Sequence, residues 1–151
     1  MSWFKKIAGR NKKFKVGIVG FSDSVFNKKK AKEIVENAFD EIAEKKSDYD
    51  IVIVSGLTNM GIPALAYQEA KKRNWKTVGI SAEEAKEYDL FPCDTVLYKG
   101  EKFGDESDYF LNYIDLLIKI GGGKQSIAEF KKAKKMGIKT KKYNLPERNK
   151  K

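Results

Sequence analysis

Histidine is absent from the 151 residues of this chain. Catalytic triads that depend on histidine, histidine-ligated metal sites and imidazole proton relays are therefore excluded. Any acid–base chemistry must use carboxylates, lysine or tyrosine. A single cysteine, Cys93, excludes an internal disulfide and is typical of a reducing compartment. Because a catalytic thiol usually needs a histidine partner, we interpret Cys93 as a structural residue.

Long apolar runs are also missing. No stretch of about 18 or more apolar residues occurs, so the sequence predicts no membrane span. The start of the chain does not have the pattern of a secretory signal, and we expect a cytoplasmic protein. A chain of this length is large enough for one domain with a substantial hydrophobic core.

The net charge of +10 is concentrated at the two ends of the chain. Residues 1–15 carry six Lys/Arg and no acid, and residues 131–151 carry ten Lys/Arg and one acid. The stretch between them, 16–130, has fifteen basic and twenty acidic residues. Basic ends can bind nucleic acid or anionic lipid through counterion release. They can equally serve as a solubilising surface, which is the interpretation that we favour.

Predicted strands and helices alternate through the body of the chain. Short runs rich in β-branched residues predict strands over 14–20, 49–55, 76–80, 95–98, 116–120 and 138–143. Helical spacing of apolar residues and helix-ending signals predict helices over 28–46, 62–73, 82–86, 109–114 and 126–136. The alternation predicts an α/β fold, a Rossmann-like three-layer sandwich with a mainly parallel sheet. We expect this domain over 14–144, between a basic N-terminal extension (1–13) and a basic C-terminal tail (145–151).

Three loops that follow predicted strands are rich in small and polar residues: 20–24, 55–61 and 121–126. Because the carboxyl ends of parallel strands meet at one edge of the sheet, we expect these loops to face one crevice. The three glycines of the last loop let backbone N–H groups approach a ligand closely, and the helix expected after them adds a positive dipole end. This pattern predicts a phosphate site, although a tight turn without a ligand would look the same.

The candidate ligand-binding residues are the small and polar residues of these loops: Gly20, Ser22, Asp23, Ser55, Gly56, Thr58, Gly121, Gly122, Gly123, Lys124, Gln125 and Ser126. The last loop would hold phosphate, with Lys124 supplying charge, and the first two loops would line the ribose and base. Neither of the two commonest nucleotide fingerprints, GxGxxG and GxxxxGK[ST], is present.

Two carboxylates, Glu129 and Glu106, are the candidates for any chemistry. Glu129 lies three residues after Ser126, as in a capping box, so a structural role and a catalytic role both stay open. Glu106 belongs to the acidic segment 105–108, which can cap the next helix or contact a ribose or base. No metal site is assigned, and no cofactor is expected beyond a nucleotide ligand.

The order of these motifs resembles the SLOG superfamily. That group includes the Lonely Guy cytokinin-activating phosphoribohydrolases, often mislabelled lysine decarboxylases, and the DprA-like Rossmann domains. The resemblance covers about 15–142. Its most specific element is the pattern Pro-Gly-Gly-x-Gly-Thr-x-x-Glu, which reads Gly-Gly-Gly-Lys-Gln-Ser-Ile-Ala-Glu over 121–129. Asp115 also lies where the family often has an aspartate.

Two departures mark a divergent member. Gln125 lies where the family pattern usually has a glycine. The phosphoribohydrolases resemble one another in an arginine about fifteen residues before the motif, where this chain has Glu106, and no arginine occurs between Arg73 and Arg148. The resemblance therefore implies a nucleotide-binding or sensing module that pairs into a homodimer. Two alternatives stay open: a phosphoribohydrolase that uses Glu129, and a DNA-associated DprA-like protein that uses the basic ends.

Overall fold

The computed structural model describes residues 12–22 and 26–147. In chain order the elements are β1 (Lys13–Gly20), α2 (Lys28–Lys45), β2 (Asp50–Ser55), α3 (Gly61–Lys72), β3 (Lys76–Ser81), the 3-10 helix η1 (Glu83–Glu87), β4 (Thr95–Tyr98), α4 (Ser107–Tyr113), β5 (Leu116–Ile120), α5 (Lys124–Lys135) and β6 (Lys139–Tyr143). Each predicted strand and helix is present, and the ends differ from the prediction by no more than two residues.

Within the described residues the strands form one six-stranded sheet in the order β4-β3-β2-β1-β5-β6. Each neighbouring pair is parallel, which confirms the predicted Rossmann-like α/β fold. The chain first moves outward from β1 to β4, and then crosses to the other side of β1 to form β5 and β6. The topological switch point therefore lies between β1 and β5, where ligands bind in open parallel sheets.

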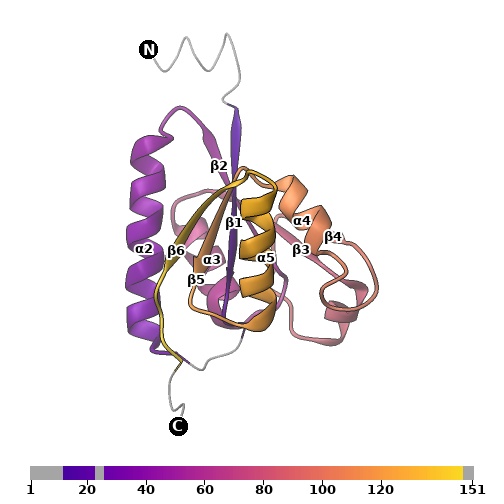
Figure 1. Cartoon of the computed structure of the whole chain (residues 1–151). Coiled ribbons are helices and arrows are strands. Elements are labelled where there is room, and N and C mark those ends of the chain that lie inside the picture. The colour runs from indigo at the N-terminus through magenta and orange to yellow at the C-terminus, as the bar shows by residue number, and fades with distance from the viewer. Residues whose placement is uncertain (1–11, 23–25, 148–151) are drawn as a thin grey trace.

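Helices cover both faces of the sheet, with α4 and α5 in front and α3 behind in Figure 1. Val16 and Ile18 of β1 pack with Phe39 of α2 on one face. Val19 of β1 packs with Phe110 of α4 on the other face. Successive side chains of a strand point to opposite faces, and both faces are buried here. This is why the strands have almost continuous apolar sequences rather than an apolar–polar alternation.

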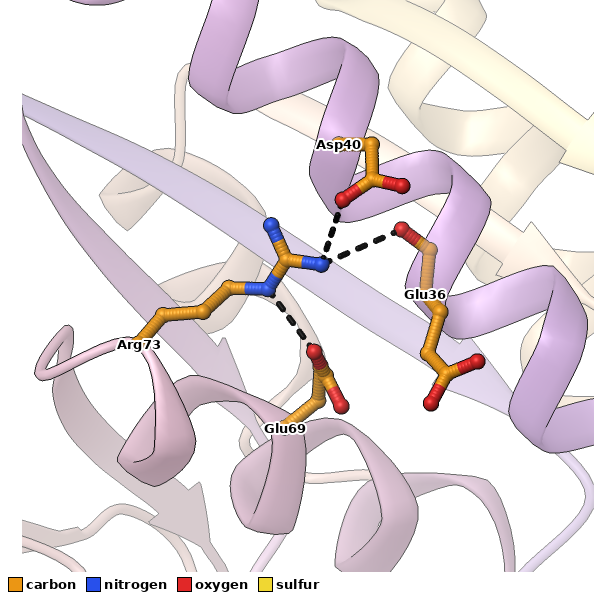
Figure 2. Close-up of polar contacts among 4 residues, drawn as sticks. All are labelled: Glu36, Asp40, Glu69 and Arg73. Atoms are coloured by element: carbon orange, nitrogen blue, oxygen red, sulfur yellow. Dashed lines mark hydrogen bonds and ion pairs between the residues drawn. The ribbon is translucent and has the colours of Figure 1, made fainter.

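Arg73 links α2 and α3, the two helices whose residues pack in the same core cluster as Val16 and Ile18, as Figure 2 shows. Its Nε donates to Glu69 of α3 at 2.8 Å, and its Nη2 donates to Asp40 of α2 at 2.7 Å and to the Glu36 carbonyl at 3.3 Å. The guanidinium also lies 5.4 Å from the ring centre of Trp75. The planar donor fork of arginine thus connects two successive helices of the chain.

Packing continues beyond the last strand. Leu145 is 3% exposed and belongs to the core cluster between the sheet and α2–α3. Leu145 is the first residue of the segment that we expected to be a basic C-terminal tail, and its apolar side chain folds back over the core two residues after the edge strand β6. Among the described residues, none of the helices has both the length and the apolar character that crossing a bilayer requires.

Candidate ligand-binding site

A cavity of about 760 Å³ opens at the carboxyl edge of the sheet. It is bounded by the ends of β1, β2 and β3, by the starts of α3 and α5, and by the loop that precedes α4. Many candidate residues from the sequence lie in its wall: Gly20, Ser22, Ser55, Gly56, Thr58, Glu106, Gly123, Lys124, Gln125, Ser126 and Glu129. The fold thus brings residues of the three candidate loops, together with Glu106 and Glu129, to one pocket beside the switch point.

Three candidate residues are not among those that line this pocket. Asp23 lies outside the described residues. Gly121 has φ +78, and its N–H donates to the Tyr143 carbonyl at 3.1 Å. A Cβ at Gly121 would lie 2.5 Å from the Phe21 ring, whereas a Cβ at Gly122 would be 3.8 Å from the same ring. Gly121 therefore allows the chain to turn tightly under Phe21.

The last helix begins at Lys124, two residues earlier than predicted. Gly123 is its N-cap with φ +120, and the Ile127 N–H donates to the Gly123 carbonyl at 3.0 Å. The glycines complete the turn within three residues, and neither Lys124 nor Gln125 breaks a helix. Of the two roles left open for Glu129, the capping box does not form, because Gly123 is the N-cap and Ser126 lies inside the first turn. Its hydroxyl donates instead to the Gly20 carbonyl at 3.1 Å and ties α5 to the end of β1.

The start of α5 supplies the main donors of the pocket. Among the described residues no side chain caps it. The first N–H groups of a helix have no partner within the helix and lie at its positive dipole end. The start of α3 adds less, because the Ile62 N–H donates to the Phe21 carbonyl at 2.8 Å and Pro63 has no N–H. Together with the exposed ammonium group of Lys124, α5 offers a site for an anion.

The hydroxyl groups around the pocket are not equally available. Ser55 is 1% exposed and its Oγ donates to the Ile18 carbonyl at 2.6 Å, so this hydroxyl holds β2 against β1. Ser22 is exposed and Thr58 half-buried, and both line the cavity. Of the candidate serine and threonine residues, Ser22 and Thr58 are therefore the ones whose hydroxyls can reach a bound molecule.

Two buried carboxylates share one amide in the pocket wall. Gln125 Nε2 donates to Glu106 at 3.1 Å and to Glu129 at 3.2 Å. Glu129 also accepts from the Ser107 hydroxyl at 2.6 Å, and Glu106 accepts from the Gly104 N–H at 2.9 Å. Burial raises the pKa of Glu129, the hydrogen bonds from Ser107 and Gln125 oppose this, and the charge of Glu106 adds to it. Glu106 and Glu129 thus form a pair bridged by Gln125.

The sequence did not reveal that four large apolar side chains line the pocket. We call these residues, Met60, Tyr88, Phe103 and Ile127, the apolar rim. These four side chains are 40–53% exposed. The signal was weak because Tyr88 and Phe103 occur singly in polar loops. Asp115, in contrast, lies at the start of β5, at the opposite end of the strand from Gly121, where it accepts from the Lys15 N–H at 2.9 Å.

A doubly wound parallel sheet with a pocket at the switch point and a glycine turn before a helix defines a Rossmann-like domain. The chain belongs to the SLOG cluster4 family, whose model matches residues 13–144. This match confirms the resemblance to the SLOG superfamily that the glycine motif carried.

Solved structures show the same fold. The structural genomics target TM1055 is 24% identical, with a TM-score of 0.67 over 84% of this chain and 72% of that one. The molybdenum cofactor carrier protein from Chlamydomonas reinhardtii is 17% identical, with a TM-score of 0.69 over 87% of this chain and 76% of that one. A second structure of that carrier gives a TM-score of 0.64. No curated protein matches the sequence.

Proposed function

We propose that this protein binds a nucleotide or a nucleotide derivative in the pocket and acts as a binding or sensing module. The observation that carries the proposal is the start of α5, which no side chain in the described part of the chain caps and which enters the pocket directly after the glycine turn. A phosphate group would accept hydrogen bonds from the first N–H groups of α5 and pair with Lys124. Ser22, Gly56 and Thr58 would then line the sugar on the other side of the cavity.

Three further findings support a small-molecule ligand. A cavity of about 760 Å³ falls within the range of roughly 300–1,000 Å³ that such sites occupy in proteins. Membership of the SLOG family supports a nucleotide-related ligand for a Rossmann-like domain. The likeness to a carrier of the molybdenum cofactor supports binding without turnover.

A thermal-shift screen tests the proposal. The panel consists of nucleoside mono-, di- and triphosphates, cyclic nucleotides and NAD derivatives. A ligand at about 100 times its Kd should stabilise the folded state by about 2.7 kcal/mol. Each hit is recovered and checked by chromatography, because an intact ligand indicates a binding module. No shift with any member of the panel would contradict the proposal.

Two lysine-to-glutamate variants test whether the ligand phosphate binds at the start of α5. Lys124→Glu places an acid at the start of α5, where it should weaken binding of a nucleotide hit on the order of tenfold or more. Lys131→Glu makes the same charge change on the same helix at an exposed residue that is not among those lining the cavity, and it should have little effect. Equal losses in both variants would indicate a general charge effect rather than a phosphate site.

A second candidate function is N-glycosidic hydrolysis of a nucleoside 5′-monophosphate. The observation that favours it is the Glu129 carboxyl, which lies in the pocket wall with a raised pKa. A carboxyl in that position can stabilise or protonate groups at a glycosidic centre. Incubation with AMP, followed by chromatography, should then release adenine and ribose 5-phosphate, and Glu129→Gln should abolish the release. Intact AMP after long incubation would exclude the hydrolase and leave binding as the one proposed function.

A further inference from the structure

The apolar rim of the pocket is an unusual concentration of exposed apolar surface. Among the described residues, the large apolar side chains that are exposed number eight: Tyr49, Met60, Tyr88, Val96, Phe103, Tyr109, Ile127 and Met136. Half of these line the same cavity. Exposed apolar side chains gathered at a concave site mark a ligand or partner contact, whereas scattered ones do not.

Hydrogen bonds hold the loops that carry the two aromatic residues. The Phe103 N–H donates to the Glu84 carboxylate at 2.9 Å, and the Glu84 N–H donates to the Glu101 carbonyl at 2.9 Å. The Tyr88 N–H donates to the Ala85 carbonyl at 3.0 Å, at the end of η1. These bonds hold the backbone of both ring-bearing segments to η1.

The rings of Tyr88 and Phe103 belong to residues that line the cavity, and they are not stacked in parallel. The ring centres of Tyr88 and Phe103 are 5.6 Å apart, and the planes meet at 56°. Such a tilted pair does not cover its faces by parallel stacking, and Tyr88 is 53% exposed. Met60 and Ile127 add flexible and branched apolar surface beside these rings. A flat, rigid ring system with a face that can stack, and that needs little conformational ordering, matches such a surface.

We propose that the rim formed by Met60, Tyr88, Phe103 and Ile127 binds the nucleobase of the ligand by stacking and apolar contact. The inference rests on the proposed nucleotide-binding function, since the phosphate end at α5 orients the molecule and leaves its ring for the rim. Ile127 follows the phosphate-binding turn on the same helix, and Met60 precedes α3, so the rim is continuous with the anion site. Base–aromatic stacking tolerates every base, so the rim supplies affinity more than base identity.

Isothermal titration calorimetry on the full chain tests the inference with two kinds of probe: ribose 5-phosphate, which has no base, and the four nucleoside 5′-monophosphates. The wild-type protein should bind at least one nucleotide about tenfold or more tightly than ribose 5-phosphate. Tyr88→Ala and Phe103→Ala should each remove much of that excess and leave the affinity for ribose 5-phosphate within about twofold. Tyr88→Phe should retain it, because the ring stays.

Tyr49→Ala is the matched control. Tyr49 is an exposed tyrosine directly before β2, at the opposite end of that strand from the pocket. Its removal should not change either affinity. Nucleotide affinity that is unchanged in Tyr88→Ala and Phe103→Ala would overturn the stacking role while nucleotide binding itself stands. A parallel loss for both probes would also overturn it, since the loss would then come from the fold. A wild-type protein that binds neither probe would refute the proposed function and this inference with it.

Discussion

Gly121 shows how one residue can be required for the shape of the pocket without touching a ligand. Its φ of +78 lies in the left-handed region, and a Cβ would meet the Phe21 ring at 2.5 Å. Gly121→Ala should therefore lower the free energy of unfolding by about 1–3 kcal/mol. Urea denaturation measures the loss.

Gly56→Ala is the comparison for Gly121→Ala. A Cβ at Gly56 would meet no atom within 4 Å, and its backbone is not in the left-handed region. The free energy of unfolding should therefore change by less than about 0.5 kcal/mol. A loss of unfolding free energy in Gly121→Ala that is as small as the loss expected for Gly56→Ala would show that the turn at Gly121 tolerates a side chain.

Glu129 should make the stability of the protein depend on pH. Because burial raises its pKa in the folded state, the folded protein holds this proton more tightly than the unfolded chain does. The carboxyl thus adds stability below its ordinary pKa, and this contribution is lost as the pH rises through the raised pKa. Glu129→Gln cannot titrate. The free energy of unfolding of Glu129→Gln should exceed that of the wild type by most near pH 7, and this difference should shrink toward about pH 4.

Thermal unfolding of both proteins across this pH range measures the effect of Glu129. A glutamine at this position can still accept from Ser107, which holds the local geometry constant. A Glu129→Gln variant that is destabilised by the same amount at every pH would contradict the prediction. The loss of a specific hydrogen bond, rather than the cost of a buried charge, would then dominate.

At the scale of elements, the contact between α2 and α3 depends on Arg73. Its side chain is 21% exposed and that of its partner Glu69 is 11% exposed, so solvent does little to replace the bond. Arg73→Ala leaves the Glu69 carboxylate without this donor and should cost about 1–3 kcal/mol of unfolding free energy. Denaturant unfolding tests the prediction.

The pair Lys45–Glu41 is the control for Arg73. Its two side chains are 67% and 35% exposed, and both residues lie on α2. Lys45→Ala should cost less than about 0.5 kcal/mol, since exposed pairs within a helix contribute little. Arg73→Ala that is no more costly than Lys45→Ala would show that apolar packing alone joins the two helices.

At the scale of the whole molecule, the pocket and the basic ends can be separated. Residues 1–11 and 148–151 carry three Lys/Arg each and no acid, and they lie outside the described residues. A chain of residues 12–147, which keeps the buried Leu145, should bind nucleotides as well as the full chain does. Any affinity of the full chain for DNA should depend steeply on salt and be lost in this shorter chain.

Fluorescence anisotropy with labelled DNA at two salt concentrations measures this difference, with circular dichroism to check folding. DNA binding that survives truncation would place the contact on the body of the protein. The same preparations test the homodimer that the SLOG resemblance implies, by light scattering after size exclusion. We expect a dimer, and a monomer at every concentration would contradict that expectation.

Much of the fold could be predicted from the sequence because its signals are local. The β-branched run of β2 and the apolar stripe of α2 indicate their own structures, and the alternation of such segments implies parallel strands. The glycine turn before α5 was predicted for the same reason. The first residue of α5 was not predicted correctly. The sequence offers two helix starts only a few residues apart, a capping-box pattern at Ser126 and Glu129 and a glycine N-cap at Gly123, and local signals do not decide between them.

The sequence by itself determined the elements, the mainly parallel α/β class and the carboxyl edge as the place for a site, whereas the order of the strands came from the structure. Tertiary structure decided which groups are free to act there. The hydroxyls of Ser55 and Ser126 bond to carbonyls of β1, and Gln125 joins Glu106 to Glu129 across two elements. Tyr88 meets Phe103 through loops that are distant in sequence. Such pairings depend on distances between segments, which no local pattern of residues encodes.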